Sequence, residues 1–410
     1  MLLEIDRTLL LDTIKTQDLQ DTSGQAAINR EHLADEALKV VRNGFADLDL
    51  RQIEIRGNLA LCVRSNPHLV ALRCLNRVIR QAIGIQPSDR DAVIRRLNTV
   101  LSEGVPHRLY KFDIKQFFES IDVLELFGQL SNEPRIPRNA VLVLENFLYE
   151  LVNRNIVGLP RGIQLSATLS EYALKRFDRF VSRLPEVYYY ARYVDDIVIV
   201  TAARESRAEF ELLLRKALPP GLRFNRNKTK CIDIPVQSRS DGSGIVGDFD
   251  YLGYNFSIHE TKRVDQRYSR DVDVTIAPKK IRRLKSRVCR AVASFIVDGD
   301  AGLLERRLQL LTGNYNLRDL PSGRLRNVGL YCNYRRANSN TGLVELDSFL
   351  RSIFVGEHSS LARRLSYKMP YRQRRSFLRF SFSKSFASRV FYNFRPNELS
   401  RLTLCWRDAT

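Results

Sequence analysis

The chain has 410 residues, 44% of them hydrophobic, and a formal net charge of +20 at pH 7. This size and composition are those of a soluble globular protein of two or three domains, and no apolar run approaches the roughly 18–20 residues that span a bilayer. The six cysteines include no CxxC pair, and the five histidines lack metal-ligand spacing, which argues against a zinc site or a disulfide framework. Glu4 and Asp6 stand where a secretory signal would carry positive charge, so we expect a cytoplasmic protein with no membrane partner.

The positive charge is unevenly distributed. Residues 261–410 contain 31 Lys and Arg against 12 Asp and Glu, a net charge of +19, and the first 260 residues contribute only +1. This asymmetry favours a polyanionic partner that is bound mostly by the C-terminal part. A basic surface that serves only solubility is the plainer alternative.

In chain order, residues 1–30 have weak apolar periodicity and are expected to be a leader. Residues 31–101 follow the three- and four-residue spacing of helices, and residues 108–114 alternate as a short strand that ends near Asp113. Further helices are expected at residues 137–152, 166–180 and 205–217. Residues 250–256 resemble a short hairpin, and helical periodicity dominates beyond Pro278.

The segment 187–200, VYYYARYVDDIVIV, predicts two strands joined by a turn that contains Asp195 and Asp196. Two carboxylates at the lip of a sheet are costly unless cations neutralise them. One sheet can also bring Asp113 to the same edge. Three carboxylates then form a site suited to magnesium, and two ions about 3.5–4 Å apart can activate a 3′-hydroxyl and stabilise a pyrophosphate leaving group. An ordinary solvated acidic turn is the alternative.

These residues resemble the motifs of reverse transcriptases, in the order that the family shows. The resemblance covers roughly residues 70–256 and rests on Tyr193–Asp196 (the YxDD box), Phe112–Ile121 (motif A), Leu159–Ser170 (motif B), Asn225–Lys230 (motif D) and Tyr251–Tyr254 (motif E). It implies an α+β, right-hand polymerase fold. Residues 31–256 would form fingers and a palm with a ferredoxin-like sheet, and residues 257–410 a basic helical thumb and RNA-binding region.

The resemblance also implies the roles of the polar side chains. Asp113 and Asp195 would bind two Mg²⁺ ions, for which Mn²⁺ is expected to substitute, with Asp196 as a weaker ligand and the Ile114 carbonyl holding the nucleotide-bound ion. Lys228 matches the motif D lysine, where a cation can neutralise charge on the pyrophosphate or donate a proton. A solvated lysine at a strand end is the alternative for Lys228.

The incoming deoxynucleoside triphosphate would lie against motifs A and B. Phe118 matches the aromatic gate under the sugar, which leaves no room for a 2′-hydroxyl, unless Phe117 and Phe118 both belong to the core. Arg161 stands where most family members carry Gln, and a permanent cation there could clamp phosphate or alter how the template is read. The other expected nucleotide contacts are Gln116, Gly162, Arg90 and Arg96, the last two of which could equally be a solvated helical face. The primer grip would be Leu252 and Gly253.

The C-terminal stretch 371–394 interleaves arginines with phenylalanines. Arginines neutralise phosphates and exposed rings stack on unpaired bases, so we expect RNA contacts here. The expected RNA-binding residues are Arg372, Arg374, Arg375 and Arg379. Phenylalanines that close the core beneath a coat of arginines are the alternative.

The form PRGIQLSATLSEYAL of motif B resembles prokaryotic defence-associated and abortive-infection reverse transcriptases. The segments LTGNYNLRD and GLYCNYRRAN resemble the class that works beside a second reverse transcriptase and a non-coding RNA. The implied function is RNA-directed DNA synthesis in antiviral defence, with an RNA template, a DNA product and a homo- or hetero-oligomeric state left open. Alternatives are a template-independent nucleotidyl transferase, a non-catalytic RNA-binding scaffold, and a retron or group II intron-type enzyme.

Overall fold

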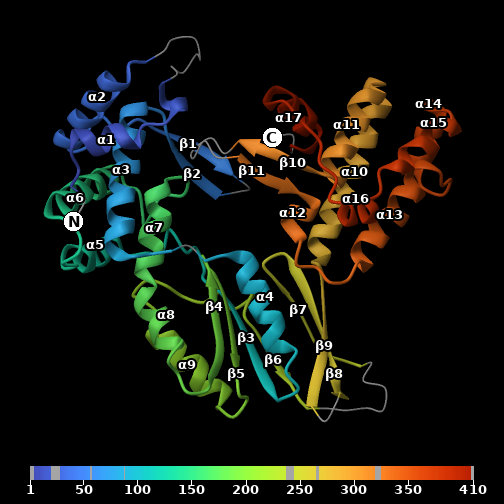
Figure 1. Cartoon of the computed structure of the whole chain (residues 1–410), viewed down its shortest axis with the longest axis horizontal. Helices are drawn as coiled ribbons and strands as arrows, with labels where there is room; N and C mark the ends of the chain where they lie inside the picture. The colour runs from blue at the N-terminus through green and yellow to red at the C-terminus, as the bar shows by residue number, and fades with distance from the viewer. Residues whose placement is uncertain are drawn as a thin grey trace. The chain divides into compact units, whose positions relative to one another are not determined.

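The computed structural model describes residues 4–19, 28–55, 58–86, 88–236, 244–264, 267–318 and 325–407. The chain divides into two compact units (Figure 1). Unit 1 consists of Met1–Val93 and Pro106–Ile234, and unit 2 of Ile94–Val105 and Pro235–Thr410. In the part of the chain that the structure describes, no helix is long and apolar enough to cross a membrane.

Unit 1 combines helices with a four-stranded and a two-stranded sheet. Its helices are α1 (Arg7–Thr13), η1 (Thr16–Leu19), α2 (Arg30–Arg42), α3 (Asn66–Ile83), α5 (Val123–Ser131), α6 (Arg138–Asn153), α7 (Gln164–Ala173), α8 (Lys175–Val181) and α9 (Arg207–Ala217). Its strands are β1 (Leu50–Ile55), β2 (Asn58–Val63), β3 (His107–Asp113), β4 (Val187–Tyr193), β5 (Asp196–Thr201) and β6 (Lys230–Ile234). Helix α4 (Arg90–Leu101) begins in unit 1 and continues into unit 2.

The four-stranded sheet has the strand order β4-β5-β3-β6, and its neighbouring strands are antiparallel. Along the chain, β3 is followed by helices, then the β4–β5 hairpin, then α9 and β6. This is the βαββαβ arrangement of the ferredoxin-like fold, as expected from the sequence. Phe177 of α8 and Phe210 of α9 belong to the same buried cluster as Phe112 and Ile197 of the sheet, so these helices cover one face.

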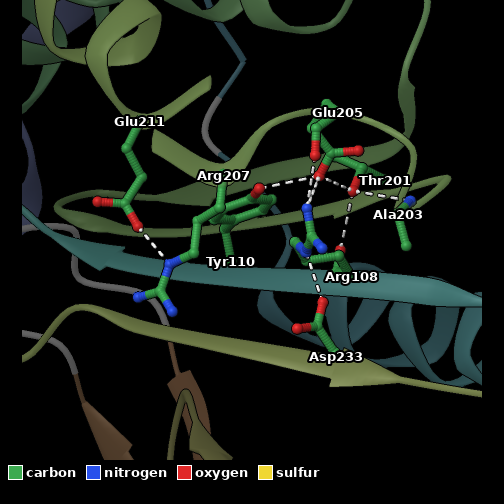
Figure 2. Close-up of polar contacts among 8 residues, drawn as sticks. All are labelled: Arg108, Tyr110, Thr201, Ala203, Glu205, Arg207, Glu211 and Asp233. Carbon is green, nitrogen blue, oxygen red and sulfur yellow. Dashed lines mark hydrogen bonds and ion pairs between the residues drawn. The ribbon is translucent and has the colours of Figure 1, made fainter. Parts of the chain in front are cut away.

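A polar network fixes the strand register at the end of the sheet where β3 begins (Figure 2). The Glu205 carboxylate accepts hydrogen bonds from Arg108 of β3 at 3.3 Å and from the hydroxyls of Tyr110 and Thr201 at 2.8 Å each. Arg108 also donates to Asp233 of β6, so three strands share the network. The register that pairs Arg108 with Thr201 also pairs Asp113 with Asp196 at the opposite end of the two strands. This register is specific, because a strand that slipped by one residue would turn every side chain to the other face of the sheet.

Two expectations for the N-terminal part need correction. The predicted leader is instead part of the core of unit 1, since Leu9 and Leu10 of α1 are buried among the residues of α2 and α3; residues 1–3 and 20–27 lie outside the described range. The predicted helical pattern over residues 31–101 is interrupted by the β1–β2 hairpin, in which Leu50 pairs with Val63. Strands β1 and β2 are stabilised by hydrogen bonds to each other, and the spacing of apolar residues along one segment does not reveal such pairing.

Unit 2 contains a three-stranded antiparallel sheet, a helical bundle and a small hairpin. Its strands are β7 (Ile245–Tyr251), β8 (Tyr254–Val264), β9 (Arg267–Ile276), β10 (Asn314–Arg318) and β11 (Leu325–Gly329). Its helices are α10 (Pro278–Asp298), α11 (Ala301–Thr312), α12 (Leu330–Tyr334), α13 (Thr341–Phe354), α14 (Ser360–Lys368), α15 (Tyr371–Ser376), η2 (Phe377–Arg379), α16 (Phe382–Ala387), α17 (Pro396–Thr403) and η3 (Leu404–Trp406).

The boundary between the units differs from the one expected at Phe256. Strand β8 continues to Val264 and pairs with β9, so a cut at Phe256 would divide the three-stranded sheet. Residues 94–105 join this unit as well: the Ser102 carbonyl accepts the Arg270 amide at 2.9 Å, and Glu103 forms a β-bridge with Ser269. The C-terminal region is therefore not wholly helical, because antiparallel pairing holds the consecutive strands β8 and β9 together despite their charged sequence.

Candidate active site

The three expected catalytic carboxylates meet at one edge of the four-stranded sheet. Asp113 is the last residue of β3, and Asp196, the first residue of β5, is its register partner. The backbone amide of Ile114 donates to the Asp195 carbonyl at 3.1 Å, which joins the end of β3 to the β4–β5 turn. A strand end and a two-residue hairpin turn thus bring together carboxylates that are separated by about eighty positions in the chain.

The turn itself has a strained backbone. Tyr193 pairs with Asp196, so Val194 and Asp195 are the two turn residues, and Val194 has φ +60°. A β-branched side chain is strongly disfavoured in this left-handed region, so the surrounding structure must hold the turn in place. Strain of this kind is expected where the position of a functional group matters more than local stability.

Arg192 provides much of that support. Its guanidinium donates to the Val194 carbonyl at 3.0 Å and forms a fork with Asp178 of α8, at 2.8 and 2.6 Å. The same group reaches Glu171 of α7 at 2.7 Å, and Arg192 is only 6% exposed. A buried guanidinium with this many acceptors fixes the hairpin to two helices, because each hydrogen bond to a charged group is stronger than a neutral one.

The carboxylates raise one another's proton affinity. Burial first, and then the charge of Asp195, raises the pKa of Asp196 to about 6. Burial also raises the pKa of Asp195, with the charge of Asp113 as a further cause. Carboxylates that are this close and partly dehydrated favour a cation among them.

A side-chain cation from motif D is present at Asp113. The Lys228 ammonium donates to Asp113 Oδ1 at 2.8 Å, and this contact raises the pKa of Lys228. The Asn225 side chain approaches Asp113 Oδ2 at 3.4 Å, and its backbone amide donates to the Asp113 carbonyl at 2.7 Å. Motif D therefore lies directly against the carboxylate of motif A.

The residues present suit a hard divalent cation. Within the described ranges, no group of three or more His, Cys, Asp and Glu side chains is already disposed to hold a metal ion. The Lys228 ammonium instead neutralises Asp113, while Asp195 and Asp196 keep raised pKa values. Carboxylate oxygens are what Mg²⁺ prefers, and displacement of one partly exposed ammonium would leave all three carboxylates available to it.

Motifs A and B are also joined. The amide of Leu159 donates to the Phe118 carbonyl at 2.8 Å, and the Arg161 guanidinium lies 5.3 Å from the centre of the Phe118 ring. Glu119 accepts two hydrogen bonds from Arg161, at 2.6 and 3.1 Å. The charge of Arg161 is therefore balanced by a neighbouring carboxylate, and its expected action on phosphate or template stays a prediction.

The two adjacent phenylalanines of motif A have different surroundings. Phe117 is 1% exposed and belongs to the core of unit 1. Phe118 is half-buried and lies under Arg161. Gln116 has φ +45° and an exposed side chain, and Gly162 has φ +94° with a Cβ position that would lie 2.4 Å from the Leu61 carbonyl oxygen. Only glycine fits the Gly162 position.

Two neighbouring cavities lie beside the catalytic turn in unit 1. One, of about 260 Å³, is lined in part by Tyr193 and Val194, and the other, of about 490 Å³, in part by Lys15 and Arg77. Their shared wall consists of Asn76, Arg80, Ile85 and Gln164. The larger cavity is polar and basic, although its Arg73 already pairs with Asp18 at 2.6 Å.

Some expected site residues belong to unit 2 or to the helix that both units share. Leu252 and Gly253 form the turn between β7 and β8 in unit 2, with φ +47° and +85°, which is the pattern of a type I′ hairpin. Arg96 is exposed on the part of α4 that belongs to unit 2, and Arg90 begins the same helix in unit 1. Their roles as primer grip and triphosphate contacts remain predictions.

The four expected RNA-binding arginines separate into two kinds. Arg374 is 9% exposed and donates to the Phe354 carbonyl at 3.0 Å, and Arg379 pairs with Glu305 at 2.6 Å. Arg372 and Arg375 are exposed. The Arg374 guanidinium joins α15 to the end of α13, and the RNA contacts of all four arginines stay predictions.

Three polar side chains at the site were not expected from the sequence. Arg192, Asn225 and Glu119 each contact a motif residue directly. Arg192 had one available signal: an arginine within an apolar strand is rarely buried unless it is paired. Its partners on α7 and α8 could not be identified without the tertiary structure.

Comparison with known proteins supports the assignment of the domain. The model of the family described as reverse transcriptase (RNA-dependent DNA polymerase) matches residues 65–256. A comparison with curated proteins found no match.

Solved structures of telomerase are similar to the chain at low identity. The apo telomerase of Candida tropicalis has 13% identity and a TM-score of 0.36, over 88% of this chain and 64% of that one. The form truncated of its C-terminal domain has 13% identity and a TM-score of 0.34, over 58% and 61%. The Candida tropicalis telomerase bound to a fragment of telomeric RNA has 12% identity and a TM-score of 0.37, over 93% and 68%.

The chain thus spans less than two thirds of the length of the first two telomerase chains, and TM-scores this low do not establish a shared fold. The family match instead covers the segment that contains the carboxylates, the motif A and B contacts and Lys228. Residues 65–256, just under half of the chain, therefore match the reverse transcriptase domain of RNA-dependent DNA polymerases.

Proposed function

We propose that the chain is an RNA-directed DNA polymerase that transfers nucleotides to a 3′-hydroxyl at Asp113, Asp195 and Asp196. The observation that supports this most is the strand register, which sets Asp113 opposite Asp196 at the sheet edge within the matched domain. The bond from the Ile114 amide to the Asp195 carbonyl brings the third carboxylate to the same edge.

Reverse transcriptase domains use divalent metal ions, and we propose two Mg²⁺ ions held by Asp113 and Asp195, with Asp196 and the Ile114 carbonyl in support. When bound, such ions activate the attacking hydroxyl and stabilise the leaving pyrophosphate. Lys228 would then exchange its contact with Asp113 for the phosphates of the nucleotide. Its partly exposed side chain, 59% accessible, can make that exchange at little cost.

Phe118 would select the sugar of the incoming nucleotide. The hydrogen bond from the Leu159 amide holds the backbone carbonyl of Phe118, and the Arg161 guanidinium lies over its ring. A fixed ring beside the sugar excludes a 2′-hydroxyl by volume. Deoxynucleoside triphosphates would therefore be the preferred substrates.

The template RNA would pass the cavities beside the turn. Lys15, Arg77 and Arg80 line the larger cavity, and Arg80 also lines the smaller one, which reaches Val194. Cations along such a path neutralise phosphates without reading the sequence. The amides of Asn76 and Gln164 would add hydrogen bonds to the sugar or the bases.

We also propose that this synthesis serves antiviral defence in a prokaryote, on a dedicated non-coding RNA and beside a second reverse transcriptase. The support is the resemblance of motif B and of the C-terminal segments to that class. Sequencing of the nucleic acid that copurifies with the chain identifies template and product. Phage plating on cells that carry the active or the inactive chain tests the defence role.

The activity itself is tested with Asp195→Asn/Asp196→Asn in primer extension on RNA with Mg²⁺. We expect a loss of incorporation of at least about 10³-fold, because the double variant removes the negative charge that would hold the divalent ions, and those ions would stabilise the developing negative charge of the transition state. The melting temperature of the variant should equal or exceed that of the unaltered chain. Incorporation at the unaltered rate would refute the site assignment.

Template-independent transfer is a distinct outcome of the same assay. Arg161, the side chain that could permit such transfer, pairs with Glu119. We therefore expect that the product follows the template sequence. Equal incorporation of all four nucleotides without template would favour the transferase instead.

A further inference from the structure

The surface of α14 and α15 in unit 2 is rich in positively charged side chains. Residues 358–397 contain ten Lys and Arg and no Asp or Glu. Some of these cations have structural roles, as Arg374 and Arg379 do. The exposed ones on the two helices are Arg363, Arg364, Lys368, Arg372 and Arg375, and these five define the basic face.

Helical spacing places the cations of each helix on its exposed side. In α14, the inward positions Ala362, Leu365 and Met369 are buried, so Arg363, Arg364 and Lys368 lie on the opposite side. In α15, Arg374 points inward and anchors the helix to the Phe354 carbonyl. Arg372 and Arg375 are left outward, three positions apart, on a helix that follows α14 after only two residues (Figure 1).

Two tyrosines lie among the cations. Tyr367 is 88% exposed and Tyr371 is 54% exposed. The Arg374 guanidinium lies 5.6 Å from the centre of the Tyr371 ring, which partly orders that ring. A large aromatic side chain as exposed as Tyr367 gains nothing from burial, so its ring is available as a stacking platform.

The face is also rigid. Leu365, Met369 and Phe377 belong to the buried cluster of unit 2, and they hold α14, α15 and the following turn in place. Cations on a rigid scaffold lose less conformational entropy when they bind a polyanion than cations on a flexible tail. The sequence alone had suggested a phenylalanine-rich surface over 371–394, but Phe377, Phe380 and Phe382 are core residues.

We propose that this basic face binds single-stranded nucleic acid, with the five cations on the phosphates and Tyr367 stacked on an unpaired base. Base pairs inside a duplex are stacked on both faces, whereas unpaired bases offer a free face, so the exposed ring favours a single strand over a duplex. The proposal goes beyond DNA synthesis and does not require the carboxylates to be active. RNA and single-stranded DNA share the chemistry, and the binding assay distinguishes them.

The test measures binding of a labelled 20-nucleotide RNA to the full chain that carries Asp195→Asn/Asp196→Asn, over a range of salt concentrations. Catalysis is absent there, so a failure of this proposal is distinct from a failure of the polymerase assignment. Arg363→Gln/Arg364→Gln/Lys368→Gln should flatten the slope of log affinity against log salt by about 2, at about 0.7 per phosphate contact. Tyr367→Leu should weaken binding about tenfold and leave the slope unchanged.

The matched control is Arg154→Gln/Arg207→Gln/Arg215→Gln, which removes the same charge from side chains that pair with Glu150 and Glu211. Its slope should stay that of the parent. An equal change in slope for both triple variants would mean that only net charge matters and would overturn the proposal. Equal affinity for a duplex of the same length would also overturn the proposal, as would full competition by poly-glutamate. Tighter binding of the DNA strand than of the RNA would assign the face to the product.

Discussion

At the scale of single residues, Asp196 is largely buried and lies next to the charge of Asp195, and both the burial and this charge favour its neutral form. In an unfolded chain an Asp carboxyl has a pKa near 3.9. With a folded pKa of about 6, the folded protein holds more protons than the unfolded one between these two values. Its free energy of unfolding therefore falls as the pH rises through this window.

Asp196→Asn removes the loss of folding stability that the ionisation of Asp196 causes. Without divalent metal and at pH 7.5, we expect the variant to be more stable than the unaltered chain by about 1–2 kcal/mol, after allowance for solvent screening. At pH 4 the difference should vanish, because Asp196 is then protonated in the folded state. Urea unfolding in EDTA at both pH values measures this. The control Asp12→Asn, at an exposed position, should show no such pH dependence.

Phe118 and Phe117 are adjacent, but only one of them is placed to contact a ligand. Phe118→Ala should raise the ratio of ribonucleotide to deoxynucleotide incorporation by roughly 10–100-fold, because it removes a volume that excludes the 2′-hydroxyl. Phe118→Tyr keeps the ring and should keep the selectivity. Steady-state incorporation of both nucleotides on one primer provides the ratio. An unchanged ratio in Phe118→Ala would place the gate elsewhere.

At the scale of elements, the β4–β5 hairpin depends on helices that follow motif B. Arg192 connects the strained turn to Asp178 and Glu171. Its charge neutralises the carboxylates, and its planar shape lets it reach the Val194 carbonyl at the same time. A lysine can neutralise one carboxylate but cannot also reach the Val194 carbonyl as a planar fork does. The position of Asp195 would then be held less firmly.

Arg192→Lys should therefore lower kcat by about 10²-fold, since small misplacements of catalytic groups have effects of that size. The KM for nucleotide should change by less than about threefold, because Arg192 does not contact the nucleotide site. A purely structural role would instead lower the amount of folded enzyme and leave kcat per active site unchanged. Active-site titration during single-turnover incorporation separates these cases.

At the scale of the whole molecule, the fold divides after Ile234 rather than after Phe256. A chain that ends at Phe256 keeps β7 but loses most of β8 and all of β9. Tyr254 and Phe256, which are buried in the complete sheet, would be exposed. Large exposed apolar side chains and unpaired strand edges promote association.

We therefore expect the 1–256 fragment to aggregate or to melt without cooperativity, although the matched domain is nominally complete in it. Size-exclusion chromatography and thermal melting, compared with the full chain, check this. A monomeric fragment that melts cooperatively would show that the three-stranded sheet is dispensable for unit 1.

The sequence by itself determined the catalytic hairpin and the order of the motifs. Apolar β-branched residues on both sides of Asp195 and Asp196 favour a strand, a turn and a strand within fourteen residues, and such local patterns depend little on the rest of the chain. The alternation around Asp113 predicted its strand for the same reason. These elements correspond to β3, β4 and β5.

Only the tertiary structure decided which charges are available. Arg161, Arg192 and Arg374 stand in a loop, a strand and a helix, and their guanidiniums pair with Glu119, with Asp178 and with a backbone carbonyl. Those partners lie on other elements, so no spacing rule reveals them. The extent of unit 2 was hidden for the same reason, because β8 and β9 gain their stability from pairing with each other rather than from the propensities of their charged residues.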